Sequence, residues 1–331
     1  MPSTGDIRER GLARIRAMGR EGDLVLAAET QSAHRLNRAY LDRLAFEMRL
    51  LDPVVADVHT SLFGQALSSP IIGAPLGFGR LLGQLTSHGP QYGNGYLEPI
   101  AQGLREAGSL MGIGVSTPEQ VQSVIETGAR TYVITKPYRE RARIVYSMND
   151  AERRGAVALG MDVDAYFGVR TRYEPVGESY VAPMSLNDLR AVRAETSLPF
   201  ILKGILSVRD AERAVEAGAS AIVVCHHGGE TIDYAVPPLK VLPAIARALR
   251  GSGLCVLAGS GIESGTDVLK ALACGAHAVM LGTPLMIALA ADGAQGVHDL
   301  MRALADELAR NMSITGCPQV GAIDPTILHE L

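Results

Sequence analysis

The sequence predicts an α/β fold, a closed parallel (β/α)8 or TIM barrel with an N-terminal helical lead-in. Eight short apolar runs alternate with amphipathic stretches from about residue 70 to the C-terminus. Several of these stretches carry a glycine near their C-terminal end, as helix C-caps do. An open doubly wound sheet has the same alternation. It is less favoured, because no Gly-x-Gly-x-x-Gly follows the first run.

The predicted elements follow in chain order. The strands are Pro70–Pro75, Ser109–Gly114, Thr131–Thr135, Ala156–Val163, Pro199–Lys203, Ala221–Cys225, Leu254–Ala258 and Ala276–Gly282. Helical periodicity predicts Thr117–Thr127, Ser207–Gly218, Pro237–Leu249, Gly265–Gly275 and a closing helix over Val297–Leu308. Residues 1–69 are expected to form a helical extension packed on the barrel, with a helix over Ala33–Arg49. Residues 70–331 form the barrel, in a single domain overall.

Composition narrows the class of protein. The chain has 331 residues, 47% hydrophobic and 20% charged, which is ordinary for a soluble enzyme. A net charge of -4 does not favour nucleic-acid binding. The N-terminus is charged where a signal peptide is apolar, and no apolar stretch is long enough to span a membrane. The four cysteines lack paired metal spacing, so we expect no metal site. Three of them lie in apolar surroundings typical of reduced, buried thiols, so we expect a cytoplasmic protein. The expected partner is a small-molecule substrate.

Two features at the predicted barrel mouth are difficult to explain by packing. Lys203 ends an apolar strand, and a buried lysine is costly unless it meets an anion; the alternative is a lysine that reaches solvent. His227 follows strand six and Asp164 follows strand four, which predicts a base and the carboxylate that orients it. The alternative is a structural histidine satisfied by the backbone, and it weighs more for His226.

The loops after the last two predicted strands are small and glycine-rich. Gly259-Ser260-Gly261 follows strand seven and Gly282-Thr283 follows strand eight. In many barrels these two loops bind phosphate through backbone N–H groups. The glycine-rich connection Gly77–Tyr96 after the first strand is expected to act as a lid.

These residues resemble the FMN-dependent α-hydroxy acid oxidase and dehydrogenase family, which includes glycolate and lactate oxidases. The likeness is strongest from Leu198 to Asp324. Leu198–Ile205 resembles the strand-five signature, whose lysine contacts the flavin N1/O2 edge. Cys225–Glu230 resembles Ser-Asn-His-Gly-Gly-Arg, and Asp162–Asp164 is similar to Thr-Val-Asp.

The resemblance implies FMN as cofactor and hydride transfer to the flavin from a C–OH or C–NH carbon. It implies His227 as catalytic base, with Asp164 and Lys203 also catalytic. The residues assigned to substrate are Arg170, Glu230, Lys136 and His226. Those assigned to FMN are Ala74, Pro75, Leu76, Gly77, Asp162, Lys203, Cys225, Gly259, Ser260, Gly261, Gly282 and Thr283.

The sequence also departs from the family pattern. Glu230 stands where the family has a second carboxylate-binding arginine, and Lys136 stands where it has a substrate tyrosine. Both phosphate-binding arginines are absent, because Glu263 and Thr283 occupy their places. The charge reversal at Glu230 predicts a zwitterionic, amine-bearing or biosynthetic substrate instead of a simple 2-hydroxy acid.

Alternatives remain open at this stage. One is an FMN-dependent isomerase resembling type 2 isopentenyl diphosphate isomerase. Another is a flavin-free or non-catalytic barrel, which the missing arginines keep open. The electron acceptor is expected to be O2, a quinone or a partner protein, and the family tendency suggests a homotetramer.

Overall fold

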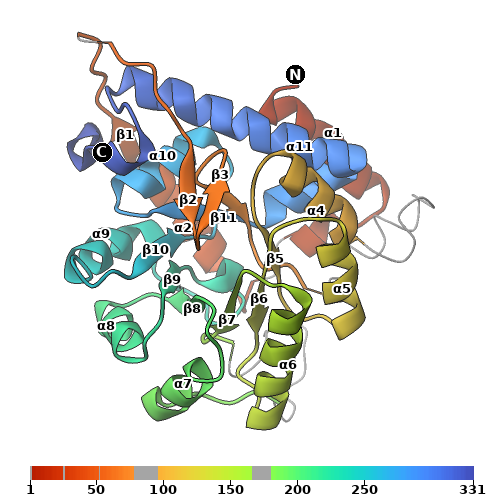
Figure 1. The fold of residues 1–331 in the computed structure, drawn as a ribbon. Coiled ribbons are helices and arrows are strands. Elements are labelled where there is room, and N and C mark those ends of the chain that lie inside the picture. Colours follow the sequence, from red (N-terminus) through yellow and green to blue (C-terminus); the bar gives the residue numbers. More distant parts are fainter. Residues whose placement is uncertain (1, 25–26, 52, 78–95, 166–179) are drawn as a thin grey trace.

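Eight parallel strands form the centre of the molecule, with helices on the outside (Figure 1). The computed structural model describes residues 2–24, 27–51, 53–77, 96–165 and 180–331. The barrel strands are β4 (Ile71–Gly73), β5 (Met111–Ile113), β6 (Thr131–Thr135), β7 (Ala158–Asp162), β8 (Phe200–Ile205), β9 (Ala221–Val224), β10 (Cys255–Ala258) and β11 (Ala278–Leu281). Their order is β4-β11-β10-β9-β8-β7-β6-β5.

The two outer strands of this order, β4 and β5, also meet. The Gly73 N–H donates to the carbonyl of Leu110 over 3.0 Å, and a parallel bridge joins Leu76 to Ile113. The eight predicted strands are therefore all present, and the predicted barrel is confirmed.

The helices of the barrel are α4 (Leu97–Glu106), α5 (Pro118–Glu126), α6 (Arg141–Arg154), α7 (Leu186–Arg193), α8 (Val208–Glu216), α9 (Pro238–Ala248), α10 (Gly265–Ala273) and α11 (Thr283–Ile314). The four helices predicted between the strands, which are α5, α8, α9 and α10, begin and end within two residues of their predicted bounds. Side chains cap several N-termini: Thr117 and Ser185 form capping boxes, and Ser207 accepts a backbone hydrogen bond from Asp210.

Side-chain alternation along each strand separates two apolar clusters. On β8, Phe200 and Leu202 pack outward against helices, whereas Ile201 belongs to the cluster inside the barrel. Lys203 has the same parity as Ile201, so it lies inside at the end of the strand. Alternation thus determines which residues reach the mouth.

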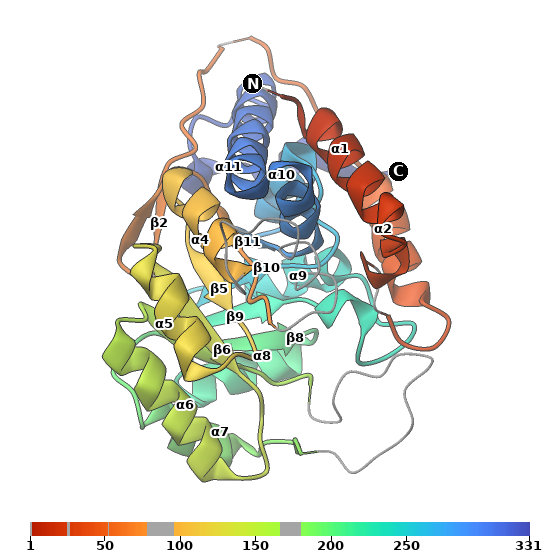
Figure 2. The ribbon, with the colours of Figure 1, turned by 90° about the vertical axis from the view of Figure 1, so that its right-hand side faces the viewer.

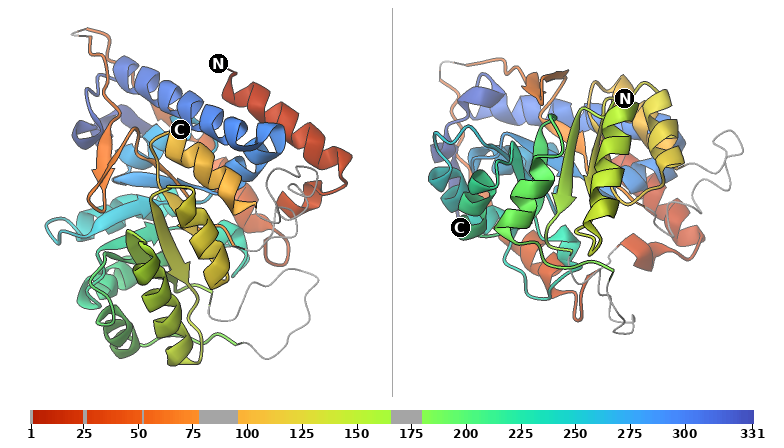
Figure 3. Two further views of the ribbon diagram at one scale, coloured as in Figure 1. Left: turned by 45° about the vertical axis from the view of Figure 1, so that its right-hand side comes forward. Right: turned by 60° about the horizontal axis from the view of Figure 1, so that its bottom comes forward.

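The N-terminal region contributes α1 (Thr4–Ala17), η1 (Glu21–Leu24), α2 (Ser32–Asp42), β1 (Leu44–Phe46) and a hairpin of β2 (Thr60–Leu62) with β3 (Gln65–Leu67). Helix α1 packs along α11 (Figure 3). The hairpin and α2 lie at opposite ends of the barrel (Figure 2). Because Leu62 and Leu67 belong to the interior cluster, the hairpin fills the end opposite α2.

Two predicted helix boundaries are wrong. The helix expected over Ala33–Arg49 ends at Asp42, because Leu44–Phe46 pairs antiparallel with β12 (Leu328–Glu330), which η5 (Pro325–Ile327) precedes. The closing helix expected over Val297–Leu308 is the middle of the longer α11, whose backbone breaks at Asp292 and Gly293. The strand Leu44–Phe46 could not be recognised locally, because its pairing partner Leu328–Glu330 lies at the other end of the sequence.

Other predictions stay open. Residues 78–95 of the expected lid lie outside the described residues. The division of the chain at residue 69 also stays a prediction. No helix among the described residues is long and apolar enough to cross a membrane.

Candidate active site

Three neighbouring strands bring three charged side chains together at the barrel mouth. Asp162 pairs in register with Lys203 of β8, and Thr135 pairs with Met161, so that Lys136 follows β6 beside Asp162. The Nζ of Lys203 donates to Oδ1 of Asp162 over 2.7 Å, and the Nζ of Lys136 donates to Oδ2 over 2.7 Å. The anion that the sequence required for a buried Lys203 is therefore Asp162.

Burial and charge oppose each other in this group. Burial raises the pKa of Asp162, but the charges of Lys203, His227 and Lys136 outweigh it and hold that pKa well below its usual range. Burial likewise lowers the pKa of Lys203, and the Asp162 carboxylate more than reverses this. The carboxylate and the Lys203 ammonium are therefore ionised at neutral pH.

A bulge at the end of β8 brings Asp164 into the site. The register between β8 and β9 shifts between Lys203 and Ile205, and Gly204 at that point has φ 101°. A Cβ at Gly204 would lie 2.4 Å from Cγ of Asp164. Only glycine fits here, because it tolerates both the left-handed backbone and the contact.

His227 lies between these groups. Its Nδ1 is 3.0 Å from Nζ of Lys203 and 3.4 Å from Oδ1 of Asp164. Its Nε2 is 3.9 Å from Oε2 of Glu230, the residue that follows the short turn η3 (His227–Gly229). The backbone φ of His227 is 50°, an uncommon value that is often found at functional sites. The predicted proximity of His227 and Asp164 is confirmed, but its catalytic role is not tested by this geometry.

His226 is buried more deeply than its neighbour, with 2% of its surface exposed. Neither ring nitrogen has a hydrogen-bond partner among the described residues, and the same is true of Oδ2 of Asp164. Burial lowers the pKa of His226 to about 4, so its imidazole is neutral at pH 7. Buried polar atoms without partners are rare, and here they adjoin the mouth.

The N-terminal helix α2 forms one wall beside this site. Asp233, beyond His227, accepts hydrogen bonds from the backbone and hydroxyl groups of Thr30 and Ser32 at the start of α2. Asn37 of α2 donates to the carbonyl of Ser260 over 2.9 Å. The sequence alone does not single out Asp233 or Asn37 as site residues. The available signal for Asn37 was an amide within the apolar periodicity of the helix.

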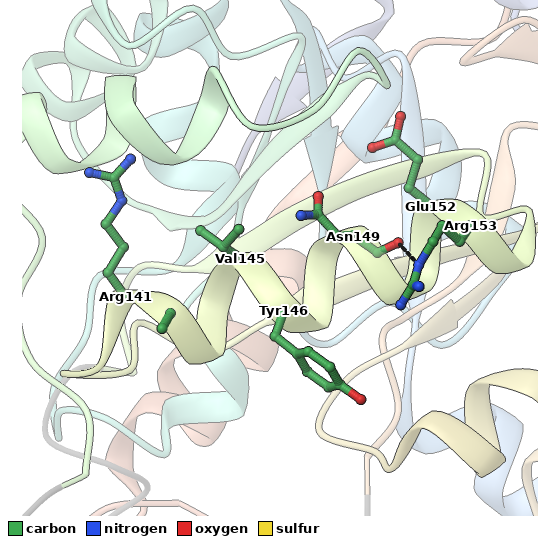
Figure 4. Close-up of a pocket in the computed structure, with 7 residues that line it drawn as sticks. Arg141, Val145, Tyr146, Asn149, Glu152 and Arg153 are labelled. Atoms are coloured by element: carbon green, nitrogen blue, oxygen red, sulfur yellow. Dashed lines mark hydrogen bonds between the residues drawn. The ribbon is translucent and has the colours of Figure 1, made fainter.

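A surface hollow and a cluster of possible metal-ligand atoms are further candidate binding features among the described residues. A hollow of about 920 Å³ lies along the outer side of α6, lined by residues such as Arg141, Tyr146 and Arg153 (Figure 4). Ligand atoms of Asp162, Asp164 and His227 lie within 4.8 Å of one another. The Lys203 ammonium already donates to this group, and a cation there would compete with it, so we assign no metal.

The comparisons with known proteins identify the family. The family model for FMN-dependent dehydrogenases matches residues 24–184 and 170–330. The chain belongs to the FMN-dependent dehydrogenase family. It is 35% identical to a 4-hydroxymandelate oxidase of Amycolatopsis orientalis, with 88% of each chain covered. It is 32% identical to an L-lactate oxidase of a Nostoc species, also with 88% of each covered.

Solved structures agree with the family assignment. A mandelate oxidase with 3,3-difluoro-2-hydroxy-3-phenylpropionic acid superposes with a TM-score of 0.85 at 33% identity, covering 99% of this chain and 98% of the other. A mandelate oxidase variant with a monooxide FMN adduct gives 0.83 at 34% identity, covering 97% and 98%. The protein is therefore an FMN-dependent oxidoreductase, which favours the oxidoreductase over the isomerase and flavin-free alternatives.

The residues at the mouth fit FMN. A Cβ at Gly259 would meet nothing closer than Cys225 Cβ at 3.4 Å, and one at Gly282 nothing closer than Ala74 Cβ at 3.7 Å. Both loops thus leave space that a side chain would fill. Burial raises the pKa of the Cys225 thiol to about 11, so this side chain, which lies inside the barrel, is uncharged at neutral pH.

The other residues predicted to hold FMN lie at the same end of the barrel. Ala74, Pro75, Leu76 and Gly77 follow β4 directly. Ser260 has φ 73° and its Oγ accepts from the His226 N–H over 3.4 Å, while Thr283 begins α11. Their contacts with the cofactor stay predictions, and Arg170 lies outside the described residues.

Proposed function

We propose that this protein oxidises a C–OH or C–NH carbon in a substrate that carries a cationic group, and that Glu230 binds this group. The observation that carries the proposal is the position of Glu230: its Oε2 lies 3.9 Å from His227 Nε2, and four-fifths of its side chain is buried. A carboxylate so near the expected base selects for positive charge beside the reacting carbon.

The local charges argue against a small anionic substrate. Asp162, Asp164 and Glu230 supply three carboxylates, and both nearby lysines already donate to Asp162. An ionised Glu230 about 5 Å from a substrate carboxylate would repel it by roughly 3 kcal/mol at an effective dielectric constant of 20. Burial raises the pKa of Glu230, and a cationic substrate group beside this carboxylate would favour its ionised form.

The residues divide the chemistry among them. FMN, when bound, would supply the flavin ring that takes a hydride from the substrate carbon. Asp164 accepts a hydrogen bond from the Nδ1–H of His227, which leaves the Nε2 lone pair free to take a proton from the substrate hydroxyl or amine. For this, the Lys203 donor that faces Nδ1 over 3.0 Å must turn away, while its bond to Asp162 remains. The resulting imidazolium is stabilised by Asp164 on one side and by Glu230 on the other.

The second candidate is the oxidation of a simple 2-hydroxy acid, and the names of the relatives favour it: 4-hydroxymandelate oxidase, L-lactate oxidase and a glycolate oxidase of Arabidopsis thaliana. On this alternative Lys136 would leave Asp162 to bind the substrate carboxylate. Because these relatives are named oxidases, we propose O2 as electron acceptor, with a quinone or a partner protein as the alternatives. Hydrogen peroxide formation during turnover would support O2 as the electron acceptor.

Flavin bleaching under anaerobic conditions tests the substrate proposal. The panel pairs 3-amino-2-hydroxypropanoate and 4-amino-2-hydroxybutanoate with lactate, glycolate and mandelate. We expect the ammonium-bearing acids to be preferred by at least tenfold in the rate of bleaching per unit concentration. Glu230→Gln should remove the preference and Glu230→Arg should reverse it, because the charge beside Nε2 changes sign.

His227→Asn is the companion variant. It should retain FMN and lose substrate bleaching by a factor of at least about 10², the usual size of a general-base contribution. Comparable bleaching of the wild-type protein by lactate, glycolate or mandelate would refute the cationic-substrate proposal. Normal bleaching in His227→Asn would refute the role of the base.

A further inference from the structure

Asp162 accepts hydrogen bonds from both lysines of the mouth at once, and no other carboxylate of the described residues does so. Its side chain is 3% exposed, and one oxygen faces each ammonium at 2.7 Å. The same carboxylate lies 3.7 Å from Nδ1 of His227. The resemblance pairs this position with a neutral threonine, so the carboxylate adds a charge that the family pattern lacks.

The strand register makes this arrangement unavoidable. The pairing of β6, β7 and β8 sets Lys136, Asp162 and Lys203 side by side at the carboxyl ends of adjacent strands. We call these three residues the mouth triad. Two ammonium groups and one carboxylate leave the triad with one positive charge. Lys203 alone would present the same net charge, so the pair Lys136 and Asp162 contributes none overall.

We infer that the mouth triad sets the reduction potential of the bound flavin, with Asp162 lowering and Lys136 restoring the positive charge that Lys203 presents to it. A reduced flavin carries negative charge on its pyrimidine edge, so positive charge beside that edge favours the reduced form. Each added or removed charge in this water-poor site therefore moves the potential in a direction that its sign determines.

The inference rests on the proposed place of Lys203 beside the flavin, and it does not depend on the proposed substrate. If the triad only stabilised the packing of the three strands, a different result would be expected. Variants of the triad would then lower the melting temperature and leave the potential unchanged. The potential therefore separates the two roles.

The experiment measures the two-electron potential of the holoprotein against reference dyes, without substrate. Asp162→Asn raises the triad charge by one, and we expect a positive shift of about 30 mV or more, which corresponds to a tenfold change in the equilibrium constant. Lys136→Met lowers the triad charge by one and should give a negative shift of similar size. The double variant restores the wild-type charge and should return close to the wild-type potential.

Asp150→Asn is the matched control. Asp150 is also a partly buried carboxylate that binds a cation, accepting from Arg154 over 2.6 Å, but it lies on α6 outside the barrel. The flavin reduction potential of Asp150→Asn should equal that of the wild-type protein. Shifts of the same sign in Asp162→Asn and Lys136→Met, or no shift in either, would overturn the inference. Should Asp162→Asn not fold, the inference still requires a negative shift in Lys136→Met and a potential close to that of the wild type in the double variant.

Discussion

Individual residues at the mouth show how buried charge is tolerated in this protein. Lys203 has 9% of its side chain exposed and Asp162 has 3%, yet each lies 2.7 Å from an opposite charge. A buried ion pair contributes little net stability, but removing one partner leaves an uncompensated charge. Asp162 serves two lysines, so its loss exposes two ammonium groups to a low-dielectric surrounding.

This predicts a pH-dependent cost for Asp162→Asn. At pH 7 the substitution should lower the free energy of unfolding by about 3–5 kcal/mol. The pKa of Asp162 is depressed in the folded state, so its ionised form stabilises the fold above the unfolded value of about 3.9 and this stability is lost as the pH falls below it. The difference between wild type and variant, measured by unfolding from pH 7 to pH 3, should shrink below about pH 4. A difference that does not change with pH contradicts this account.

The sequence alone predicts that Lys203 meets an anion, since a lysine buried at the end of an apolar strand is costly without one. The identity of the anion does not follow. Asp162 could be selected only from the register of β7 against β8, and Lys136 joins it only through the register of β6. The reversed charge at Glu230 was visible in the sequence, whereas its distance from His227 was not.

At the scale of elements, short irregular pieces place the functional groups. The bulge after Lys203 brings the backbone of Gly204 against Asp164, and the turn η3 holds His227 with a left-handed backbone. Regular strand geometry would alternate these side chains between the two faces. The bulge breaks that alternation beside the site, where bulges are often found.

Gly204→Ala should therefore damage the site more than a similar change elsewhere. Its Cβ would lie 2.4 Å from Asp164, so we expect about 1 kcal/mol of backbone strain and a further 1–3 kcal/mol from crowding. Gly218→Ala is the control, since Gly218 has φ 77° but its Cβ would be 3.7 Å from the nearest side chain. Both variants should lose stability in denaturant titrations, and only Gly204→Ala should slow substrate bleaching. Equal bleaching rates in the two variants would show that the position of Asp164 is not critical.

At the scale of the whole molecule, the candidate active site and the β2–β3 hairpin lie at opposite ends of the barrel. Helix α2 and the mouth loops lie at one end, and the hairpin β2–β3 fills the other (Figure 2). Side chains of the interior cluster lie between them, so contacts in the hairpin are remote from the charged groups. The homotetramer expected from the family stays a prediction, and light scattering would test for four times the 35.0 kDa chain mass.

Leu67→Ala tests this separation. Leu67 is buried in the interior cluster, and the cavity left by its removal should cost about 2–5 kcal/mol of unfolding free energy. The flavin absorbance and the rate of bleaching should stay unchanged in the folded variant. Leu51→Ala, at a side chain that is 92% exposed, is the control and should change neither quantity. A loss of flavin in Leu67→Ala at temperatures where it is folded would show that the two ends are coupled.

The sequence by itself determined the barrel, the order of its strands and the residues at their carboxyl ends, because apolar periodicity and turn residues are local properties. It also determined that a lysine, a histidine and an aspartate would share one mouth. Only the tertiary structure decided which charges pair, since inter-strand register joins residues far apart in the chain. It alone decided that Leu44–Phe46 is a strand and that α2 adjoins the site, because both depend on hydrogen bonds with residues at least 201 positions away.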